Sequence, residues 1–210
     1  MLIELLTPDE LLLKDSIRKF FAKELEPIAE ELEKDHALLP GLIRKMGELG
    51  FLGTFFPEEY GGNNLSLASR AIIGEETARL SAGFDITLFA DIILFARAQM
   101  NHGTHEQKEK YMRPVIEGKK IGALAITEPD AGSDALGIKT TATKDGDYYV
   151  LNGSKTFITN APIADYFAIL ARTGREESKI KGGTFFILER GMKGLETGPP
   201  LEKLGMRSSP

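Results

Sequence analysis

Apolar positions recur with a helical period along roughly the first 120 residues of the chain. Thr7-Pro8-Asp9-Glu10 combines a capping threonine, a proline suited to the first helical turn and a glutamate that can reach back to the cap. This pattern predicts a helix from there to about Glu24. Pro27 indicates the start of a second helical stretch, and Pro40 begins a third that Gly50 closes.

A strongly apolar stretch lies between residues 82 and 99. Apolar residues occupy nearly the whole circumference of the predicted helix, which is typical of a central buried helix. Another stretch with helical spacing precedes it at 66–78. Thr104-His105-Glu106-Gln107 is a second capping-box pattern, and the helix that it opens is expected to end near Gly118.

Beyond Lys120 the pattern changes to that of β-strands, which are predicted over 138–143, 148–151, 156–159, 166–171 and 184–188. Asp145-Gly146 and Asn152-Gly153 are turn dipeptides, so two consecutive tight hairpins are expected. The fold class that follows is α+β. We expect an all-α N-terminal domain over 1–120 and an antiparallel β-barrel-like or sandwich domain over 121–210.

Composition narrows the function classes. Lys plus Arg number 26 against 31 Asp plus Glu, and the net charge of -5 comes with no basic run that could neutralise a phosphate backbone. We therefore expect no nucleic-acid partner. The chain has no cysteine, its apolar stretches are interrupted before membrane-spanning length, and its first residues lack the pattern of a leader peptide. These features predict a cytoplasmic protein without membrane insertion.

Small and hydroxyl-bearing residues surround Gly132 in the segment 123–134, Ala-Leu-Ala-Ile-Thr-Glu-Pro-Asp-Ala-Gly-Ser-Asp. Such residues let backbone N–H groups approach an anion such as a pyrophosphate closely. The other interpretation is a strand followed by an ordinary turn. The chain has neither the G-x-G-x-x-G motif of a Rossmann site nor a P-loop motif.

Asp91 stands out because its neighbours in the predicted central helix are apolar. Burying a carboxylate there costs several kcal/mol unless it is partnered or neutral, so Asp91 is a candidate catalytic acid or base. The alternative is that Asp91 lies on a solvated stripe of the helix or pairs with Arg97. His102 and His105 straddle a loop and a helix cap and have no evident third ligand, so no metal site is expected.

Three motifs in order resemble the acyl-CoA dehydrogenase family: Thr127-Glu128-Pro129-x-x-Gly132-Ser133-Asp134, Gly137-Ile138-Lys139-Thr140, and Leu151-Asn152-Gly153-x-Lys155-x-Phe157-Ile158-Thr159-Asn160. The resemblance extends back to Gly50-Phe51-Leu52-Gly53 and forward to Lys203-Leu204-Gly205-Met206-Arg207, so it covers nearly the whole chain. It implies a helical domain, a β domain and a second helical domain. The second helical domain is absent from this chain, and the β domain looks short of its last strands.

The resemblance also implies bound FAD. Leu124, Ile126 and Thr127 would line the flavin ring, with the Thr127 hydroxyl at its pyrimidine side, and Ser133 with the Gly132 backbone would hold the pyrophosphate.

Phe157, Ile158 and Thr159 would cover the other side of the ring, with the Thr159 hydroxyl near the flavin N5. Many family members have Trp where this chain has Phe157, and the other interpretation of Phe157 is a plain core aromatic.

The activity implied is α,β-dehydrogenation of an acyl-CoA thioester, with hydride transfer to FAD N5 and electrons passed to an electron-transfer flavoprotein. The base in most relatives is a glutamate of the absent domain, whereas Asp91 resembles the acid of the subgroup that desaturates alicyclic CoA esters. The family also implies a homo-oligomer, a tetramer or a dimer. Alternatives are an acyl-CoA oxidase or flavin monooxygenase of the same fold, or a non-catalytic half that needs a complementary chain.

Overall fold

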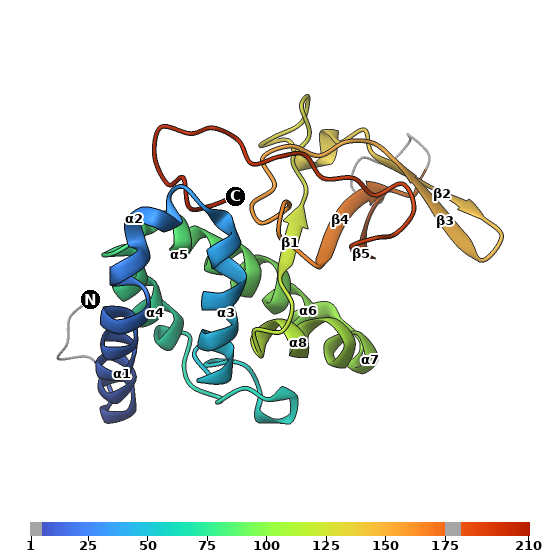
Figure 1. The fold of residues 1–210 in the computed structure, drawn as a ribbon. Coiled ribbons are helices and arrows are strands. Elements are labelled where there is room, and N and C mark those ends of the chain that lie inside the picture. The colour runs from blue at the N-terminus through green and yellow to red at the C-terminus, as the bar shows by residue number, and fades with distance from the viewer. Residues whose placement is uncertain (1–5, 175–181) are drawn as a thin grey trace.

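The computed structural model describes residues 6–174 and 182–210. A group of helices comes first along the chain and a sheet follows, joined where β1 leaves the helical region (Figure 1). The expected order of helical and β regions is therefore confirmed. Within the described residues, no helix is both long enough and apolar enough to cross a lipid bilayer.

The helical region contains both expected helix caps. The Thr7 hydroxyl accepts a hydrogen bond from the Glu10 N–H at 3.3 Å, and the Glu10 carboxylate accepts one from the Thr7 N–H at 2.9 Å. Thr104 and Gln107 form the same reciprocal pair. The elements are α1 (Pro8–Glu24), η2 (Glu26–Ile28), α2 (Ala29–Leu32), η3 (His36–Leu38), α3 (Leu39–Glu48), η4 (Glu58–Tyr60), α4 (Ala68–Ala78), α5 (Ala82–Leu88), η5 (Phe89–Ala96), α6 (Arg97–His102), α7 (His105–Gln107), η6 (Lys108–Met112) and α8 (Arg113–Ile116).

The predicted central helix is formed by α5, η5 and α6 in direct succession, with η5 in the wider π-helical form. Segment η5 buries five residues, Ala90, Asp91, Ile92, Phe95 and Ala96. It packs directly against the first strand of the sheet. A Cβ added at Gly122 would lie 2.3 Å from the Phe95 ring, so only glycine permits this close approach of strand and helix.

The sheet consists of β1 (Gly122–Ala125), β2 (Thr141–Asp145), β3 (Tyr148–Asn152), β4 (Tyr166–Arg172) and β5 (Gly183–Glu189). Its order is β1-β4-β2-β3, with β5 also pairing with β4. The β2–β3 and β4–β5 pairs are antiparallel, as expected, but β4 runs parallel to β1 and to β2. The expectation of a purely antiparallel sheet was therefore wrong. The long excursion between β1 and β4 lets the chain return in the same direction, which a tight hairpin cannot do.

The second predicted hairpin is absent, because residues 156–159 form no strand. Phe157 and Asn160 have φ angles of 56° and 71°, in the left-handed region that a continuous strand cannot contain. Thr156 bonds instead to the segment that follows β1, through its N–H and the Thr127 carbonyl. The β2–β3 hairpin through Asp145-Gly146 is confirmed.

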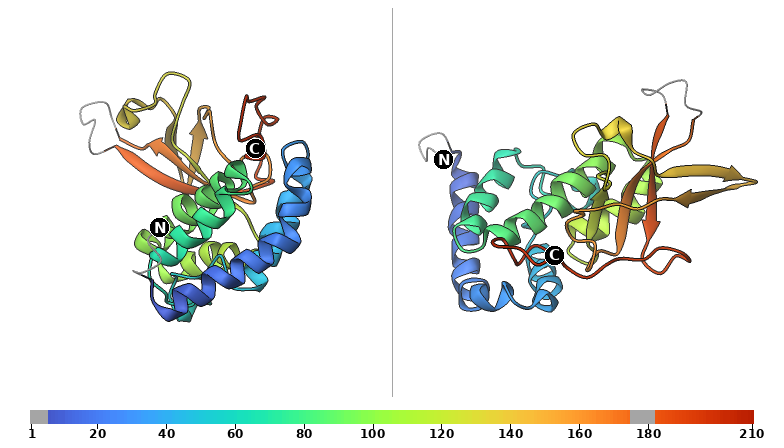
Figure 2. Two further views of the ribbon diagram at one scale, coloured as in Figure 1. Left: turned by 90° about the vertical axis from the view of Figure 1, so that its left-hand side faces the viewer. Right: turned by 90° about the horizontal axis from the view of Figure 1, so that it is seen from above.

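The last described residues return to the helical region, as Figures 1 and 2 show. The Ser208 hydroxyl lies 2.9 Å from the Ser81 hydroxyl and donates to Glu33 at 2.5 Å. The Asn160 N–H donates to the Pro210 carbonyl at 3.0 Å. One apolar core accordingly spans both regions, with Phe84 and Phe95 from the helices and Ala123 and Phe167 from the sheet.

Candidate functional site

Two segments that are far apart in the sequence lie side by side after β1 and β3. The Thr156 N–H donates to the Thr127 carbonyl at 2.9 Å, and the Lys155 ammonium donates to the Ile126 carbonyl at 2.9 Å. The two motifs from which flavin contacts were predicted are therefore in direct contact. Phe157, Ile158 and Thr159 follow immediately on the second segment.

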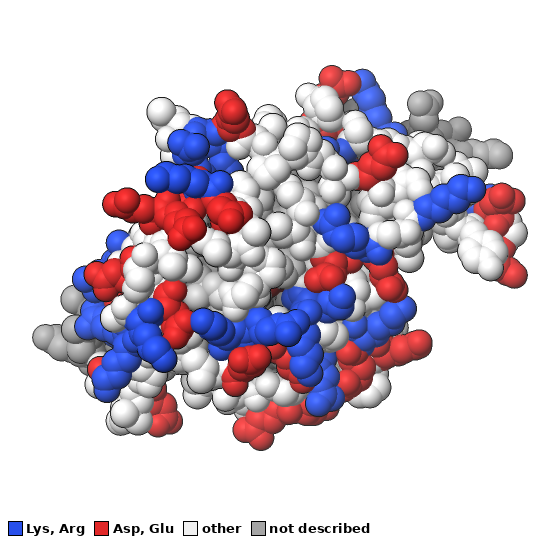
Figure 3. All heavy atoms as spheres, viewed as in Figure 1, with Lys and Arg blue, Asp and Glu red and all other residues white. Residues whose placement is uncertain are grey.

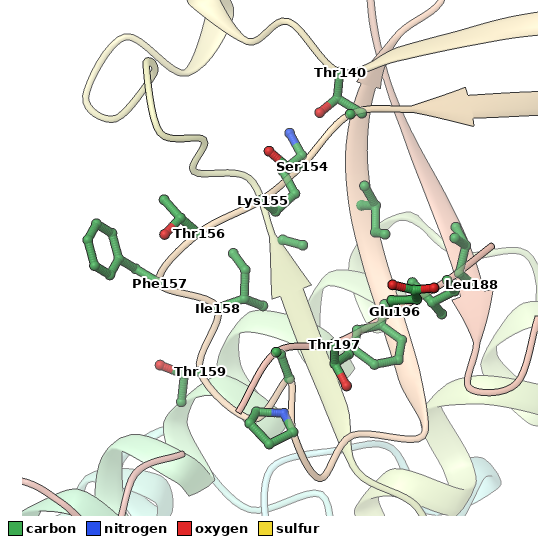
Figure 4. Close-up of a pocket in the computed structure, with 18 of the residues that line it drawn as sticks. Thr140, Ser154, Lys155, Thr156, Phe157, Ile158, Thr159, Leu188, Glu196 and Thr197 are labelled. Carbon is green, nitrogen blue, oxygen red and sulfur yellow. The ribbon is translucent and has the colours of Figure 1, made fainter. Parts of the chain in front are cut away.

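Phe157 is an aromatic residue in an unusual position, because 74% of its surface is exposed and its φ angle lies in the left-handed region. In Figure 4, Thr156, Phe157 and Thr159 point away from Leu188 and Glu196, whereas Ile158 points toward them. A left-handed φ at a residue other than glycine costs about 1–3 kcal/mol and persists only where the surroundings impose it. The interpretation of Phe157 as a core aromatic is therefore excluded in this chain.

Asn160 holds this segment against the rest of the molecule. Its side chain is completely buried, and its amide donates to the Thr87 carbonyl at 3.0 Å and to the Gly122 carbonyl at 3.2 Å. One side chain thus ties the Phe157–Thr159 segment to α5 and to β1. Asn160 is part of the third sequence motif, but nothing in the sequence signals this anchoring role.

A cavity of about 1260 Å³ opens between the sheet, the 153–159 segment and the C-terminal residues (Figure 4). Among the predicted flavin residues, Phe157, Ile158 and Thr159 line it. Leu124, Ile126, Thr127, Gly132 and Ser133 do not. Alternate residues of a strand face opposite sides of the sheet, and on β1 it is Ala125 that lines the cavity.

The predicted anion-binding segment forms a turn after β1. Glu128 and Ala131 exchange two backbone hydrogen bonds, at 2.9 and 3.2 Å, so the turn interpretation is correct as a description of the backbone. Gly132 and Ser133 follow on the surface, and a Cβ added at Gly132 would meet nothing within 4 Å. The backbone there is open to a ligand, and its role in binding an anion stays a prediction.

Glu128 and Lys155 form a buried ion pair beside these segments, with 2.7 Å between Lys155 Nζ and Glu128 Oε1. Glu128 also accepts hydrogen bonds from the Lys139 N–H at 2.6 Å, the Thr140 N–H at 3.0 Å and the Thr140 hydroxyl at 2.5 Å. Burial raises the pKa of Glu128, but the Lys155 ammonium, the Thr140 hydroxyl and the two N–H groups together lower it to about 2. The sequence gives no local signal for this pair, because Glu128 and Lys155 lie 27 positions apart.

Asp91 is fully buried, with 0% of its surface exposed, and lies against the start of β1. Its Oδ1 accepts a hydrogen bond from the Gly122 N–H at 2.7 Å, and its Oδ2 has no hydrogen-bond partner among the described residues. Burial raises the pKa of Asp91 well above its ordinary value, against the lowering effect of the Gly122 N–H. The structure thus excludes both alternatives considered for Asp91, a solvated stripe and a pair with Arg97. Asp91 does not line the large cavity.

In the part of the chain that the structure describes, no group of three or more His, Cys, Asp or Glu side chains could hold a metal ion. His105 Nδ1 lies 3.1 Å from the Tyr60 hydroxyl, so its neighbour is a phenol. On the face shown in Figure 3, basic and acidic side chains are interspersed around a largely uncharged centre.

Comparison with known proteins places this geometry in a family. Residues 7–119 match the model of the acyl-CoA dehydrogenase N-terminal domain, and residues 123–210 match that of the acyl-CoA dehydrogenase middle domain. The chain belongs to the acyl-CoA dehydrogenase family, whose members are FAD-dependent oxidoreductases.

The relatives extend beyond the region that this chain covers. A short-chain specific acyl-CoA dehydrogenase of Clostridium acetobutylicum is 41% identical over 204 residues, which are 97% of this chain and 54% of the relative. A structure described as the electron transferring flavoprotein of Acidaminococcus fermentans shares 44% identity, covering 97% of this chain and 53% of that one, with a TM-score of 0.92. A FAD complex of an acyl-CoA dehydrogenase from Bacillus anthracis gives 36% identity, 100% and 35% coverage, and a TM-score of 0.91. The chain thus spans about half the length of the curated relative.

Proposed function

We propose that this chain supplies the flavin-binding half of an enzyme that oxidises an acyl-CoA thioester to its α,β-unsaturated form. The observation that carries the proposal is the direct contact between the two family motifs, made through the Thr156 N–H and the Thr127 carbonyl. Contact between these segments is what a flavin held by both of them requires. Family membership over residues 7–119 and 123–210 supports the same reaction.

The surface around the two segments fits FAD. Phe157 is exposed and points to the same side as Thr159 in Figure 4, and Gly132 and Ser133 leave an open backbone on the loop after β1. An exposed aromatic face suits stacking, while an open glycine and a hydroxyl suit a pyrophosphate. When bound, FAD supplies the acceptor for the hydride that leaves the substrate.

Each predicted contact has a distinct part in this proposal. The hydroxyls of Thr127 and Thr159 orient the ring by hydrogen bonding, and Phe157 covers it. The carbonyl of Thr127 is already engaged by the Thr156 N–H, which leaves its hydroxyl for the ligand. Leu124 and Ile126 are the apolar neighbours proposed to exclude water from the ring, while Ile158 points to the opposite side of its segment from Phe157. The absence of an indole N–H at Phe157 makes the proposed environment less polar than in relatives with Trp.

Asp91 is the proposed base within this chain. A carboxylate kept from water has a pKa closer to that of the carbon acid beside a thioester, which favours proton transfer near neutral pH. In this proposal the Oδ2 of Asp91, a buried atom with no hydrogen-bond partner among the described residues, takes that proton while Oδ1 remains bonded to the Gly122 N–H. This acid on the first domain supports an alicyclic CoA ester as the substrate, in place of a straight chain.

The test of Asp91 is its amide variant. In the complete natural protein, Asp91→Asn should retain FAD but slow the anaerobic reduction of the flavin by substrate about 10²-fold or more, since an amide cannot accept the proton. Stopped-flow absorbance measures the rate. An unchanged rate removes Asp91 from the mechanism and leaves the base to another residue.

The physiological context belongs to the same proposal. We expect an electron-transfer flavoprotein as the acceptor of the electrons, in keeping with the similarity to the Acidaminococcus fermentans structure. We also expect a homotetramer or homodimer working in the cytoplasm. Analytical ultracentrifugation of the complete protein tests the assembly.

The decisive experiment is an anaerobic bleaching screen of the FAD-loaded complete protein against straight, branched and alicyclic CoA esters. Fastest bleaching by an alicyclic ester supports the full proposal, and fastest bleaching by a straight-chain ester retains the dehydrogenase and rejects the alicyclic substrate. FAD that is lost, or never bleached by any ester, indicates a non-catalytic half instead. Rapid reoxidation of the reduced enzyme in air indicates an oxidase.

A further inference from the structure

Lys155 is a buried charged residue that joins the two motif segments. Only 8% of its side chain is exposed, and its ammonium donates to the Ile126 carbonyl at 2.9 Å and to the Glu128 carboxylate at 2.7 Å. Both acceptors belong to the segment that follows β1. Lys155 itself immediately precedes Thr156 and Phe157, so its two bonds join the segments that carry the predicted ring contacts.

The Glu128 carboxylate extends this connection to a third segment. It accepts the N–H groups of Lys139 and Thr140 and the Thr140 hydroxyl, in the residues that lead into β2. Glu128 therefore fixes the end of β1 relative to the start of β2, while Lys155 fixes it relative to the chain after β3. A small cavity of about 210 Å³ borders the same residues, lined by Glu128, Lys139 and Thr140 among others.

A buried ion pair of this kind is not explained by stability alone. Removing two charges from water costs several kcal/mol per ion, and a well-packed apolar pair of similar volume is often as stable. The bond from Lys155 to the Ile126 carbonyl has no such substitute, because an apolar side chain cannot donate to a backbone oxygen. What the pair provides is a defined distance between Thr127 and the Phe157–Thr159 segment.

We propose that Lys155, together with Glu128, is a positioning residue that sets the spacing of the two flavin-contacting segments. The proposal rests on the proposed function, because the spacing matters only if both segments hold one flavin. Lys155 itself contacts no cofactor in this assignment. Its bonds to the Ile126 carbonyl and the Glu128 carboxylate determine the positions of the Thr127 and Thr159 hydroxyls.

The experiment compares FAD binding by the complete natural protein with that of its Lys155→Met variant. Deflavinated protein is titrated with FAD by fluorescence, and the visible spectrum and midpoint potential of the bound flavin are recorded. Since small displacements of positioning groups have large effects, we expect the dissociation constant of FAD to rise about tenfold or more and both flavin properties to shift. Lys155→Arg keeps the donor and should restore part of the affinity.

Arg70→Met is the matched control. It breaks the Arg70–Asp85 pair, 2.8 Å apart with side chains 11% and 22% exposed, in the helical region. It should lower stability while leaving the FAD dissociation constant, spectrum and potential unchanged. If Lys155→Met does not fold, the double variant Lys155→Met/Glu128→Leu removes the unpaired charge and is measured in its place.

Each outcome decides the proposal. A folded Lys155→Met or double variant that binds FAD with the natural dissociation constant, spectrum and potential overturns the positioning role and leaves the proposed function intact. Equal shifts in Arg70→Met overturn it as well, because they reduce the effect to general destabilisation. A natural protein that does not bind FAD overturns the proposed function and the positioning role together.

Discussion

Glu128 and Asp91 are both buried acids beside β1, with 6% and 0% of their surfaces exposed, yet their surroundings are opposite. Glu128 accepts four hydrogen bonds and faces an ammonium, and its pKa falls to about 2. Among the described residues, Asp91 accepts one hydrogen bond and its Oδ2 has no partner, and burial raises its pKa well above the ordinary value. Burial alone therefore does not fix the charge of an acid. The number of donors that face it does.

The two buried acids suit two different roles. A carboxylate saturated with donors is held charged and fixed in place, which suits a structural tie between segments. A buried carboxyl group with few donors favours its uncharged form and can exchange a proton, which suits a catalytic acid or base. Glu128 fits the first description and Asp91 the second.

The largest expected effect comes from removing the charge of Glu128. Glu128→Gln leaves the buried Lys155 ammonium facing a neutral amide, and the free energy of unfolding should fall by about 3 kcal/mol. Urea unfolding followed by circular dichroism measures it. Asp130→Asn is the control, because Asp130 pairs with Lys139 on the surface, with 66% and 73% of their side chains exposed, and should lose less than about 1 kcal/mol. Equal losses in the two variants would contradict the comparison.

Low pH should reduce the free energy of unfolding by nearly as much as Glu128→Gln does, because it protonates Glu128. The pKa of Glu128 lies below its ordinary value of 4.5 in the folded chain, so its contribution is present above pH 4.5 and is lost as the pH falls toward about 2. The loss should amount to about 2–3 kcal/mol. Urea unfolding of the natural chain and of Glu128→Gln is measured at a series of pH values. The difference between the two chains gives the contribution of the Glu128 charge to the free energy of unfolding. If the difference between the two chains does not shrink as the pH falls over that interval, the low pKa is wrong.

Gly122→Ala should disturb the surroundings of Asp91. The added methyl would lie 2.3 Å from the Phe95 ring and push β1 away from η5. This shift would displace the Gly122 N–H, which donates a hydrogen bond to Asp91. We expect a loss of about 2 kcal/mol in the free energy of unfolding. Gly132→Ala is the control, because a methyl there meets nothing within 4 Å. Comparable losses in both variants would show that the close packing of strand and helix is not the cause.

Asp91→Asn is expected to change stability in the opposite direction. The raised pKa of Asp91 means that the folded chain loses stability as the pH rises above the ordinary value of 3.8, and an amide escapes this loss. Asp91→Asn should therefore be more stable than the natural chain at pH 8, with the gain shrinking as the pH falls toward 4. A difference that is constant across this range would mean that Asp91 does not titrate as proposed.

Much of the fold follows from local sequence. The capping boxes at Thr7 and Thr104, the apolar central helix and the β2–β3 hairpin were all predicted, because each depends on residues within a few positions of one another. The family motifs also identified the two segments that the structure brings into contact. The separation of helical and β regions needed only the change of period near residue 120.

What the tertiary structure alone decided depends on contacts between distant residues. The parallel pairing of β1 with β4, the left-handed Phe157 and the Lys155–Glu128 pair have no local signature. Each is set when loops of many residues close and bring particular groups together, so no window of sequence contains the cause. The partner of Asp91 is the clearest case. The sequence identified an acid among apolar neighbours, and only the packing of η5 on β1 determined that the Gly122 N–H donates to it.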